Sequence, residues 1–442
     1  MLRSSRPRRV SALVLAVTLA TCCGAARAAE PLRLEDAVRL ALQNNERARR
    51  APLRIDVAEG QKDRARGAFL PTLQAAGAAT LRSEEDRNGR ILTTAGTATL
   101  TQPILSAGSF PLYSQAGHQL EAERYGAKQD KRLLALDAAR AFLQALTSER
   151  VLEAASRRLE RARANLDNAE ARASAQLASV NDATRARLEL TSSQREVTSA
   201  QATVARAYVQ LGFLVGRAVA PPLSPPDRTT KAAESFEAAP ANQVKTALGR
   251  RADVLASRER TLALEKAAQE PMLRLVPAVT AQGQVRVLPE PLPTERAHEE
   301  TATLNLVWNI FDAGQRYADR KTRVAQAQSQ ALDDTLLRRS VETDVALALV
   351  TLRTSRELYR VAEEAVVAAQ KNSEETEILY RQGLARALEL TDANGKRFDA
   401  EVARASAKLS MEQAYLELRF ALGFDPVDGG GGDDGDEGRP GG

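Results

Sequence analysis

The chain has 442 residues, of which 27% are charged and 4% are aromatic. So few aromatic residues, beside abundant Ala, Leu, Arg, Glu and Gln, favour long helices that meet along narrow seams over one thick globular core. Five of the 62 basic residues lie within the first 28 positions, which contain no acid, and the remainder carries 57 basic and 57 acidic residues. A net charge near zero gives no electrostatic basis for binding nucleic acid.

Residues 1–28 have the features of a secretory signal peptide, with a basic start, an apolar run from Val10 to Ala20 and a small-x-small site ending at Ala28. This pattern predicts an exported protein. An alternative stays open, because Leu19-Ala20-Thr21-Cys22 also resembles a lipoprotein signal in which Cys22 would be lipidated. Both cysteines lie in this segment, so no disulfide framework is expected in the mature chain.

Residues 29–216 are predicted to form a first structural repeat. Apolar residues at helical spacing begin at Leu34, and this helix is expected to end near Leu70-Pro71. Alternating sequences then predict strands at about 72–82 and 92–104, separated by the polar turn EEDRNGR.

A very long helix is expected next, because the chain from Phe110 to about Gln176 has no convincing helix breaker after its first turn. At about 1.5 Å per residue it would form a rod of about 100 Å, either as one helix or as two end to end. Heptad spacing within it predicts packing in a helical wall rather than a separate partner site. The heptad positions are Leu152, Leu159 and Leu166, interleaved with Ala155, Ala162 and Ala169. A helix from Asn181 to Gly216 is predicted to return.

The second half of the chain repeats this plan. Residues 217–240 include PPLSPP and are expected to form a linker or a small irregular layer. Residues 241–423 then repeat the first half at an offset of 206 to 207 positions, with strands expected at about 278–287 and 301–311. Residues 424–442 are rich in Gly and Asp and are expected to form a disordered tail.

The clearest strand signal is TATLNLVWNIFDAG, in which Leu304, Leu306, Trp308 and Ile310 share one face. On an exported chain this pattern predicts a transmembrane strand with these four side chains toward lipid, although Trp308 also fits an ordinary packed aromatic. Four strands cannot close a barrel, because single-chain barrels begin at about eight strands, so several chains must contribute. The long charged helices would project into water on one side of the membrane.

Four motifs complete the pattern: AFLPTL from Ala68, QPILSAG from Gln102, WNIFDAG from Trp308 and YRQGLARALELTDA from Tyr380. Together they resemble the TolC family of outer-membrane efflux proteins over about 34–423. The resemblance implies a mainly α fold with a small β part, assembled as a homotrimer with a twelve-stranded barrel in outer-membrane lipid and an α-helical tunnel in the periplasm. It further implies a passive exit duct of a tripartite efflux or type I secretion system, with a periplasmic adaptor and an inner-membrane transporter as partners.

A candidate gate lies near the turn of the second long hairpin. Glu389 and Asp392 are three residues apart, so their carboxylates share a helix face, and a threefold assembly would stack them as acidic rings that favour cations. The resemblance places them at the family's paired tip acids, and Tyr380 also matches the family motif. Asp182 is the first-repeat equivalent of Glu389 and is expected to join a tip network with Tyr380. The alternative for the acids is an ordinary solvated helix face. Where the family has a gating arginine this chain has Ala385, which puts the family's closing bridge in doubt.

The sequence carries no recognised catalytic or metal-binding motif. The two histidines, His118 and His298, are far apart, and the mature chain lacks cysteine, so no metal cluster is predicted. The chain has no G-x-S-x-G, phosphate-binding glycine loop or H-E-x-x-H, so neither an enzyme nor a cofactor is expected. The alternative function is a periplasmic coiled-coil adaptor or scaffold without a barrel.

Overall fold

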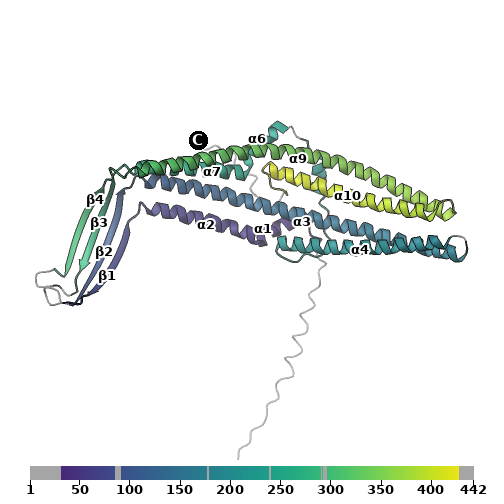
Figure 1. The fold of residues 1–442 in the computed structure, drawn as a ribbon, viewed down its shortest axis with the longest axis horizontal. Coiled ribbons are helices and arrows are strands. Elements are labelled where there is room, and N and C mark those ends of the chain that lie inside the picture. The colour runs from purple at the N-terminus through teal and green to yellow at the C-terminus, as the bar shows by residue number, and fades with distance from the viewer. Residues whose placement is uncertain are drawn as a thin grey trace, which may run out of the picture.

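The computed structural model describes residues 31–84, 91–176, 179–237, 240–289, 291 and 296–427. It is elongated, with a sheet at one end and long helices running away from it (Figure 1). The signal segment, Cys22 and the chain after residue 427 lie outside the described residues, so cleavage, lipidation and disorder there stay predictions. The elements in chain order are α1 (Leu34–Asn44), α2 (Glu46–Gly67), β1 (Thr72–Leu81), β2 (Leu92–Leu105), α3 (Ser109–Ser174), α4 (Val180–Val215), α5 (Asp227–Ser235), α6 (Pro240–Arg250), α7 (Ala252–Ala267), α8 (Glu270–Leu273), β3 (Ala278–Val287), β4 (His298–Val307), α9 (Gln315–Gln382) and α10 (Ala387–Ala421).

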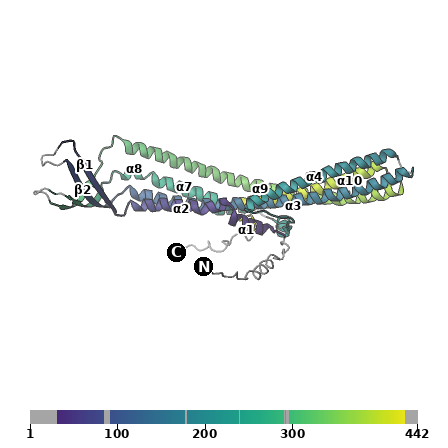
Figure 2. The same cartoon turned by 90° about the horizontal axis from the view of Figure 1, so that it is seen from below.

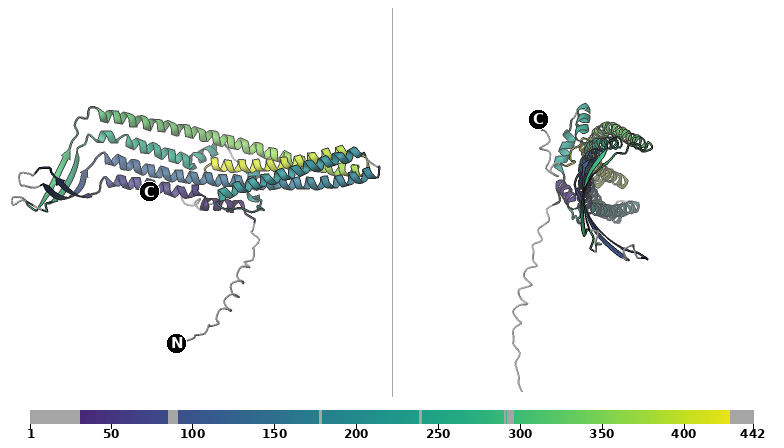
Figure 3. Two further views of the ribbon diagram at one scale, coloured as in Figure 1. Left: turned by 60° about the horizontal axis from the view of Figure 1, so that its bottom comes forward. Right: turned by 90° about the vertical axis from the view of Figure 1, so that its left-hand side faces the viewer.

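The element order confirms the mainly helical fold and its internal repeat. Helices, two strands, a very long helix and a return helix appear twice, with α5 between the halves. The long helices α3 and α9 are continuous over 66 and 68 residues, so the rod predicted from Phe110 is one helix. In the half nearer the sheet α2, α3, α7 and α9 lie side by side in that order, and in the other half α4 and α10 take the places beside the long helices (Figure 3).

The first predicted helix is divided into two at Asn45, which has extended backbone. The Asn45 side chain accepts a hydrogen bond from the N–H of Arg47, and its amide donates to the carbonyl of Leu214 at 3.0 Å. The break therefore depends on a contact with α4, 169 positions away in sequence. The spacing of apolar residues in this stretch does not reveal the break at Asn45.

The sheet is antiparallel throughout, in the order β1-β2-β3-β4. The expected strand at 301–311 is wrong at both ends, since β4 begins at His298 and stops at Val307. Val307 pairs with Ala278, the first residue of β3, so the residues after Val307 have no strand beside them. The carbonyls of Asn309 and Ile310 instead accept hydrogen bonds from Arg316.

The main core lies around the middle of the molecule, where α1, α3, α4 and α10 meet. Its large fully buried side chains include Phe142, Leu143, Leu211, Met411, Leu416 and Leu418. Farther along α3 the seam is narrow and formed by alanines: Ala155, Ala162 and Ala169 are buried, whereas Leu152 and its heptad partners are half-buried. Small side chains at these positions let the helices approach closely.

The C-terminal tail was predicted to begin at residue 424, and this boundary is wrong by four residues. Arg132 donates from Nε to Asp425 at 3.1 Å, and the guanidinium of Arg250 lies 4.5 Å from the centre of the Phe424 ring. Val427 is buried against the main core. Residues 424–427 therefore belong to the folded layer around α6 and α10.

Candidate functional site: the sheet and the helical tip

The strand register places alternate residues of all four strands on common faces, because directly paired residues of a sheet point to the same side. We call one side the apolar face; it comprises Leu73, Ala75, Gly77, Ala79 and Leu81 of β1, Leu92, Thr94, Gly96, Ala98, Leu100 and Gln102 of β2, Val279, Ala281, Gly283, Val285 and Val287 of β3, and His298, Glu300, Ala302, Leu304 and Leu306 of β4. Its charged or strongly polar members are Gln102 near one end of β2 and His298 and Glu300 at the start of β4. The opposite, polar face carries mainly Thr and Gln, with Asn305, Arg286 and Glu299.

The apolar face has dimensions that suit a membrane. The stretch from Leu73 to Leu81 contains nine residues. A tilted transmembrane β-strand needs about 9–11 residues to cross the hydrocarbon core. Large aliphatic side chains of this face, such as Leu73 and Leu304, are exposed in the single chain. The sheet curves strongly, as Figure 3 shows in its end-on view.

The four side chains of TATLNLVWNIFDAG that were predicted to face lipid fall into two groups. Leu304 and Leu306 lie in β4 on the apolar face, whereas Trp308 and Ile310 follow the end of the strand. Trp308 is 55% exposed, and its indole Nε1 donates to the carbonyl of Leu275 at 2.9 Å. This combination of a satisfied N–H and an exposed ring is the arrangement that favours Trp at a membrane–water interface.

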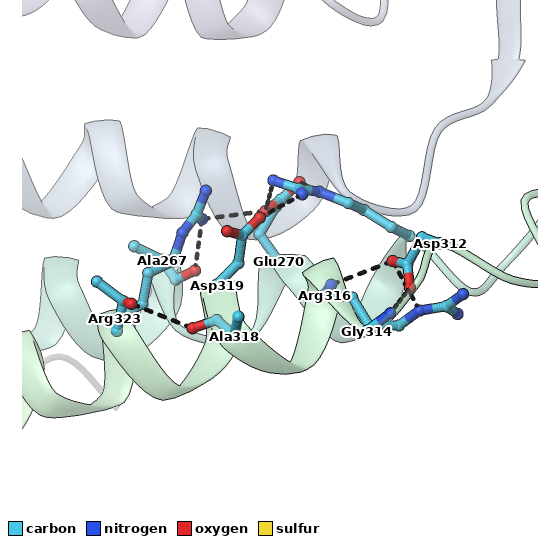
Figure 4. A network of polar contacts seen from close by, with 10 residues as sticks. Ala267, Glu270, Asp312, Gly314, Arg316, Ala318, Asp319 and Arg323 are labelled. Carbon is cyan, nitrogen blue, oxygen red and sulfur yellow. Dashed lines mark hydrogen bonds and ion pairs between the residues drawn. The ribbon is translucent and has the colours of Figure 1, made fainter.

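An ion-pair network joins the sheet to the helices (Figure 4). Asp312 accepts hydrogen bonds from the backbone N–H of Gly314 and of Arg316 and from Arg316 Nε at 3.0 Å, so it caps the start of α9. Against the opposing effect of burial, these donors hold the pKa of Asp312 below its usual value. The first repeat has Ser106 and Phe110 at the positions of Asp312 and Arg316, so repeat comparison alone does not predict this pair.

Glu270 is the centre of the adjoining part of this network. Its carboxylate accepts from Arg274 Nε at 2.7 Å and Nη2 at 2.9 Å, and lies 3.1 Å from Arg323 Nη1. Arg274 also reaches Asp319 at 2.7 Å. A Cβ atom on Gly108, just before α3, would lie 3.4 Å from Glu270 Oε1. The buried carboxylate therefore links α8 to α9 and lies close to the start of α3, where the sheet ends.

At the other end of the molecule, α9 ends at Gln382 and is followed by the capping residue Gly383, which has a φ of 80°, and α10 begins at Ala387. Both predicted tip acids are exposed and have partners within their own helix. Glu389 Oε2 accepts from the N–H of Arg386 at 3.2 Å, and Asp392 lies 2.7 Å from Lys396 Nζ. Their carboxylates are thus partly occupied, and their role in selectivity stays a prediction.

Tyr380 has a partner that the sequence did not suggest. Arg172 of α3 donates from Nη1 to the Tyr380 carbonyl and from Nη2 to the Arg381 carbonyl, both at 2.9 Å. Its guanidinium also lies 5.1 Å from the centre of the Tyr380 ring. Asp182 lies half-buried in the first turn of α4, and its expected link to Tyr380 stays a prediction. Nothing in the spacing of Arg172 distinguishes it from the many other arginines of α3.

The described residues show neither a membrane-spanning helix nor a metal site. No helix among them is long and apolar enough to cross a membrane. In the same part of the chain no group of three or more His, Cys, Asp or Glu side chains is placed to hold a metal ion. His118 is half-buried, with its Nδ1 2.8 Å from Glu259 Oε2.

Comparison with known proteins finds one matching family model and several solved structures of similar fold. A family model described as outer membrane efflux protein matches residues 37–217 and 244–424, one segment for each structural repeat. No curated protein matches the chain. Among solved structures, a membrane protein from Pseudomonas aeruginosa has a TM-score of 0.77 at 20% identity, covering 88% of this chain and 92% of its own. The CmeC outer membrane channel of Campylobacter jejuni has a TM-score of 0.76 at 15% identity, covering 90% and 87%. The MtrE outer membrane channel of Neisseria gonorrhoeae, in its open state, has a TM-score of 0.75 at 19% identity, covering 89% of each chain. At these identities the likeness shows the fold.

Proposed function

Because this chain belongs to the outer membrane efflux protein family and is an efflux duct of the outer membrane, we propose that it works as a homotrimer whose three sheets close one twelve-stranded barrel. The observation that supports this most directly is the amphipathic four-stranded sheet with two open edges, β1 and β4. Unpaired edge strands with an uncovered apolar face are unstable alone. Pairing β1 of one copy with β4 of the next removes every edge and gives the apolar face to lipid.

The helices that flank these edges support the same assembly. Next to β1, α2 exposes Leu53 and Val57, and α9, which follows β4, exposes Leu332 and Leu336. Leu53 and Val57 lie 14 and 10 residues from the sheet end of α2, or about 21 and 15 Å, and Leu332 and Leu336 lie 17 and 21 residues from the sheet end of α9, or about 26 and 32 Å. The two apolar pairs therefore lie within about two helical turns of each other along the molecule and are proposed to contact each other between neighbouring copies.

The helical tips are proposed to form the periplasmic gate. The exposed acids Glu389 and Asp392 would line it as rings that favour cations, with Tyr380 and Asp182 nearby. This proposal assigns the chain no bond-making chemistry, since a conduit needs a controlled opening and a favourable path for its cargo. Energy for transport would come from an inner-membrane transporter.

The same tips are proposed to contact a periplasmic adaptor protein of an efflux or type I secretion system. Both hairpin ends expose aliphatic side chains: Val180 is 77% exposed, Leu384 74% and Leu388 56%. Exposed apolar groups gathered at the ends of otherwise charged hairpins suit a protein contact.

Cell fractionation combined with native mass measurement tests the proposal. We expect the mature chain in the outer-membrane fraction, and a mass three times that of one chain after extraction in mild detergent. A periplasmic monomer or dimer would reject the duct and favour a coiled-coil scaffold. Mass spectrometry of the first mature residue would distinguish Ala29 from a lipidated Cys22.

A further inference from the structure

Beyond the main core the molecule consists of two helical hairpins, α3 with α4 and α9 with α10, which run together to the tip (Figure 2). Side chains of α3 connect the hairpins at intervals along the seam. Arg157 lies 2.9 Å from Glu401 of α10, and the Arg158 guanidinium lies 4.9 Å from the centre of the Phe398 ring. Arg172, two residues before the last residue of α3, makes such a connection beside the turns themselves.

Arg172 differs from the other connecting arginines in what it binds. Its two terminal nitrogens donate to consecutive main-chain carbonyls, those of Tyr380 and Arg381, while the same guanidinium stacks on the buried Tyr380 ring. The planar fork of arginine suits two parallel acceptors, and its weak hydration favours stacking on an aromatic face. Three contacts of one side chain thus fix the position of the second hairpin.

The acceptors are groups that the end of a helix leaves available. Tyr380 and Arg381 are among the last four residues of α9, whose carbonyls lack intrahelical partners and carry the negative end of the helix dipole. The N–H of Gly383 also bonds the Tyr380 carbonyl at 3.0 Å, so the turn and Arg172 share this acceptor. Moving the end of α9 away from α3 would break both Arg172 hydrogen bonds and the stacking contact together.

We propose that Arg172 is the latch that holds the α9–α10 hairpin against α3 and keeps the periplasmic end of the duct closed at rest. This inference rests on the proposed gate at the tip. It supplies the closing contact that Ala385, with its methyl side chain, cannot make.

Conductance of the full mature chain in planar bilayers tests the latch. Losing two hydrogen bonds from a charged donor should shift the closed-to-open ratio of Arg172→Ala toward open by about tenfold or more. Arg172→Lys should lie between this variant and the wild type, since one ammonium cannot reproduce the fork and the stacking. Tyr380→Leu, which keeps the carbonyls and removes the ring, should open less than Arg172→Ala.

The matched control is Arg163→Ala, because Arg163 is an exposed arginine of α3 whose side chain makes no ion pair or hydrogen bond within the described part of the chain. Its conductance should equal the wild type. Intact trimers of Arg172→Ala or Arg172→Lys with wild-type conductance would overturn the latch. A wild-type preparation that forms no trimeric pore would reject the duct itself, which separates failure of the proposed function from failure of the latch.

Discussion

The two tip acids differ in their contacts, and this difference gives a test at the scale of single residues. Glu389 bonds a main-chain N–H at the start of α10, whereas Asp392 is paired with the exposed Lys396. We expect Asp392→Asn to lower the cation-to-anion permeability ratio of the reconstituted channel by about twofold, the effect of an exposed charge worth about 0.5 kcal/mol. Glu389→Gln should lower it less.

Lys396→Gln is the control for this pair of substitutions. It removes the positive partner of Asp392 and should raise the cation preference. The reversal potential in a KCl gradient measures all three variants. Equal reversal potentials throughout would assign both acids to a solvated helix face.

Glu412 is a buried acid of α10 whose protonation is coupled to stability. It is 2% exposed, accepts from Thr230 Oγ1 at 2.5 Å and lies 3.8 Å from Lys408 Nζ. Burial raises the pKa of Glu412, Asp227 and Glu234 raise it further, and Thr230 and Lys408 oppose the increase. Since its pKa is higher in the folded than in the unfolded state, this group favours folding at low pH and loses that contribution as pH rises through the raised pKa.

Glu412→Gln should therefore stabilise the protein at pH 8 by about 1 kcal/mol and have little effect below the pKa of an unfolded glutamate, about 4.3. Thermal unfolding in detergent across this pH range provides the measurement. Glu417→Gln on the same helix serves as the control, because it removes an exposed ion pair with Arg140 and should not stabilise. A destabilised Glu412→Gln at pH 8 would mean that the charged form is the favoured one.

At the scale of elements, the two return helices stop at equivalent glycines. Gly216 and Gly423 have φ values of 75° and 80°. A Cβ atom on Gly423 would lie 2.9 Å from the backbone of Arg250 and Arg251, and one on Gly216 would lie 2.8 Å from the Cβ of Asn44. Each repeat thus packs the end of its return helix against the end of its first helix.

Gly423→Ala should lower the free energy of unfolding by about 2 kcal/mol or more, because a left-handed alanine costs about 1–2 kcal/mol before the clash is counted. Gly60→Ala is the opposite control. Gly60 lies inside α2 with no atom near its missing Cβ, so alanine there should stabilise by about 1 kcal/mol. Denaturant midpoints would compare the two, and an unaffected Gly423→Ala would reject the close approach.

The register of the sheet makes a prediction about its two faces. Leu304 lies on the apolar face and Thr303 on the polar face of β4. We expect Leu304→Arg to cost about 2–4 kcal/mol in the membrane and to reduce the yield of folded trimer, because arginine would face lipid. Thr303→Arg should fold normally because it would face the water-filled interior. Equal yields would mean that the sheet is not a barrel wall.

At the scale of the whole molecule, assembly should depend on the exposed apolar pair of α9. The double substitution Leu332→Arg and Leu336→Arg should convert the trimer to monomer, since charged groups would be buried between neighbouring copies. Asp333→Arg, one position along the same helix and about 100° around it, should leave the trimer intact. Native mass spectrometry measures both, and a trimeric double variant would place the contact elsewhere.

Much of the architecture follows from patterns within continuous stretches of sequence. Strand alternation and the repeat of 206 to 207 positions predicted four strands and two long hairpins, and the structure has them. The predicted bounds of β3 are the same as the observed ones, because the amino-acid composition of the chain changes at both ends of this strand. The end of β4 was missed, since it depends on where its neighbour β3 begins.

The sequence by itself determined the mainly helical fold, the duplication and the two-sided character of the strands, because periodicity is a property of neighbouring residues. Only the tertiary structure decided which distant groups meet. The break at Asn45 depends on Leu214, 169 positions away, and the partner of Tyr380 is Arg172, 208 positions away. Such contacts arise when the two repeats pack against each other, and hydrogen-bond geometry then selects one arginine among many with the same local surroundings.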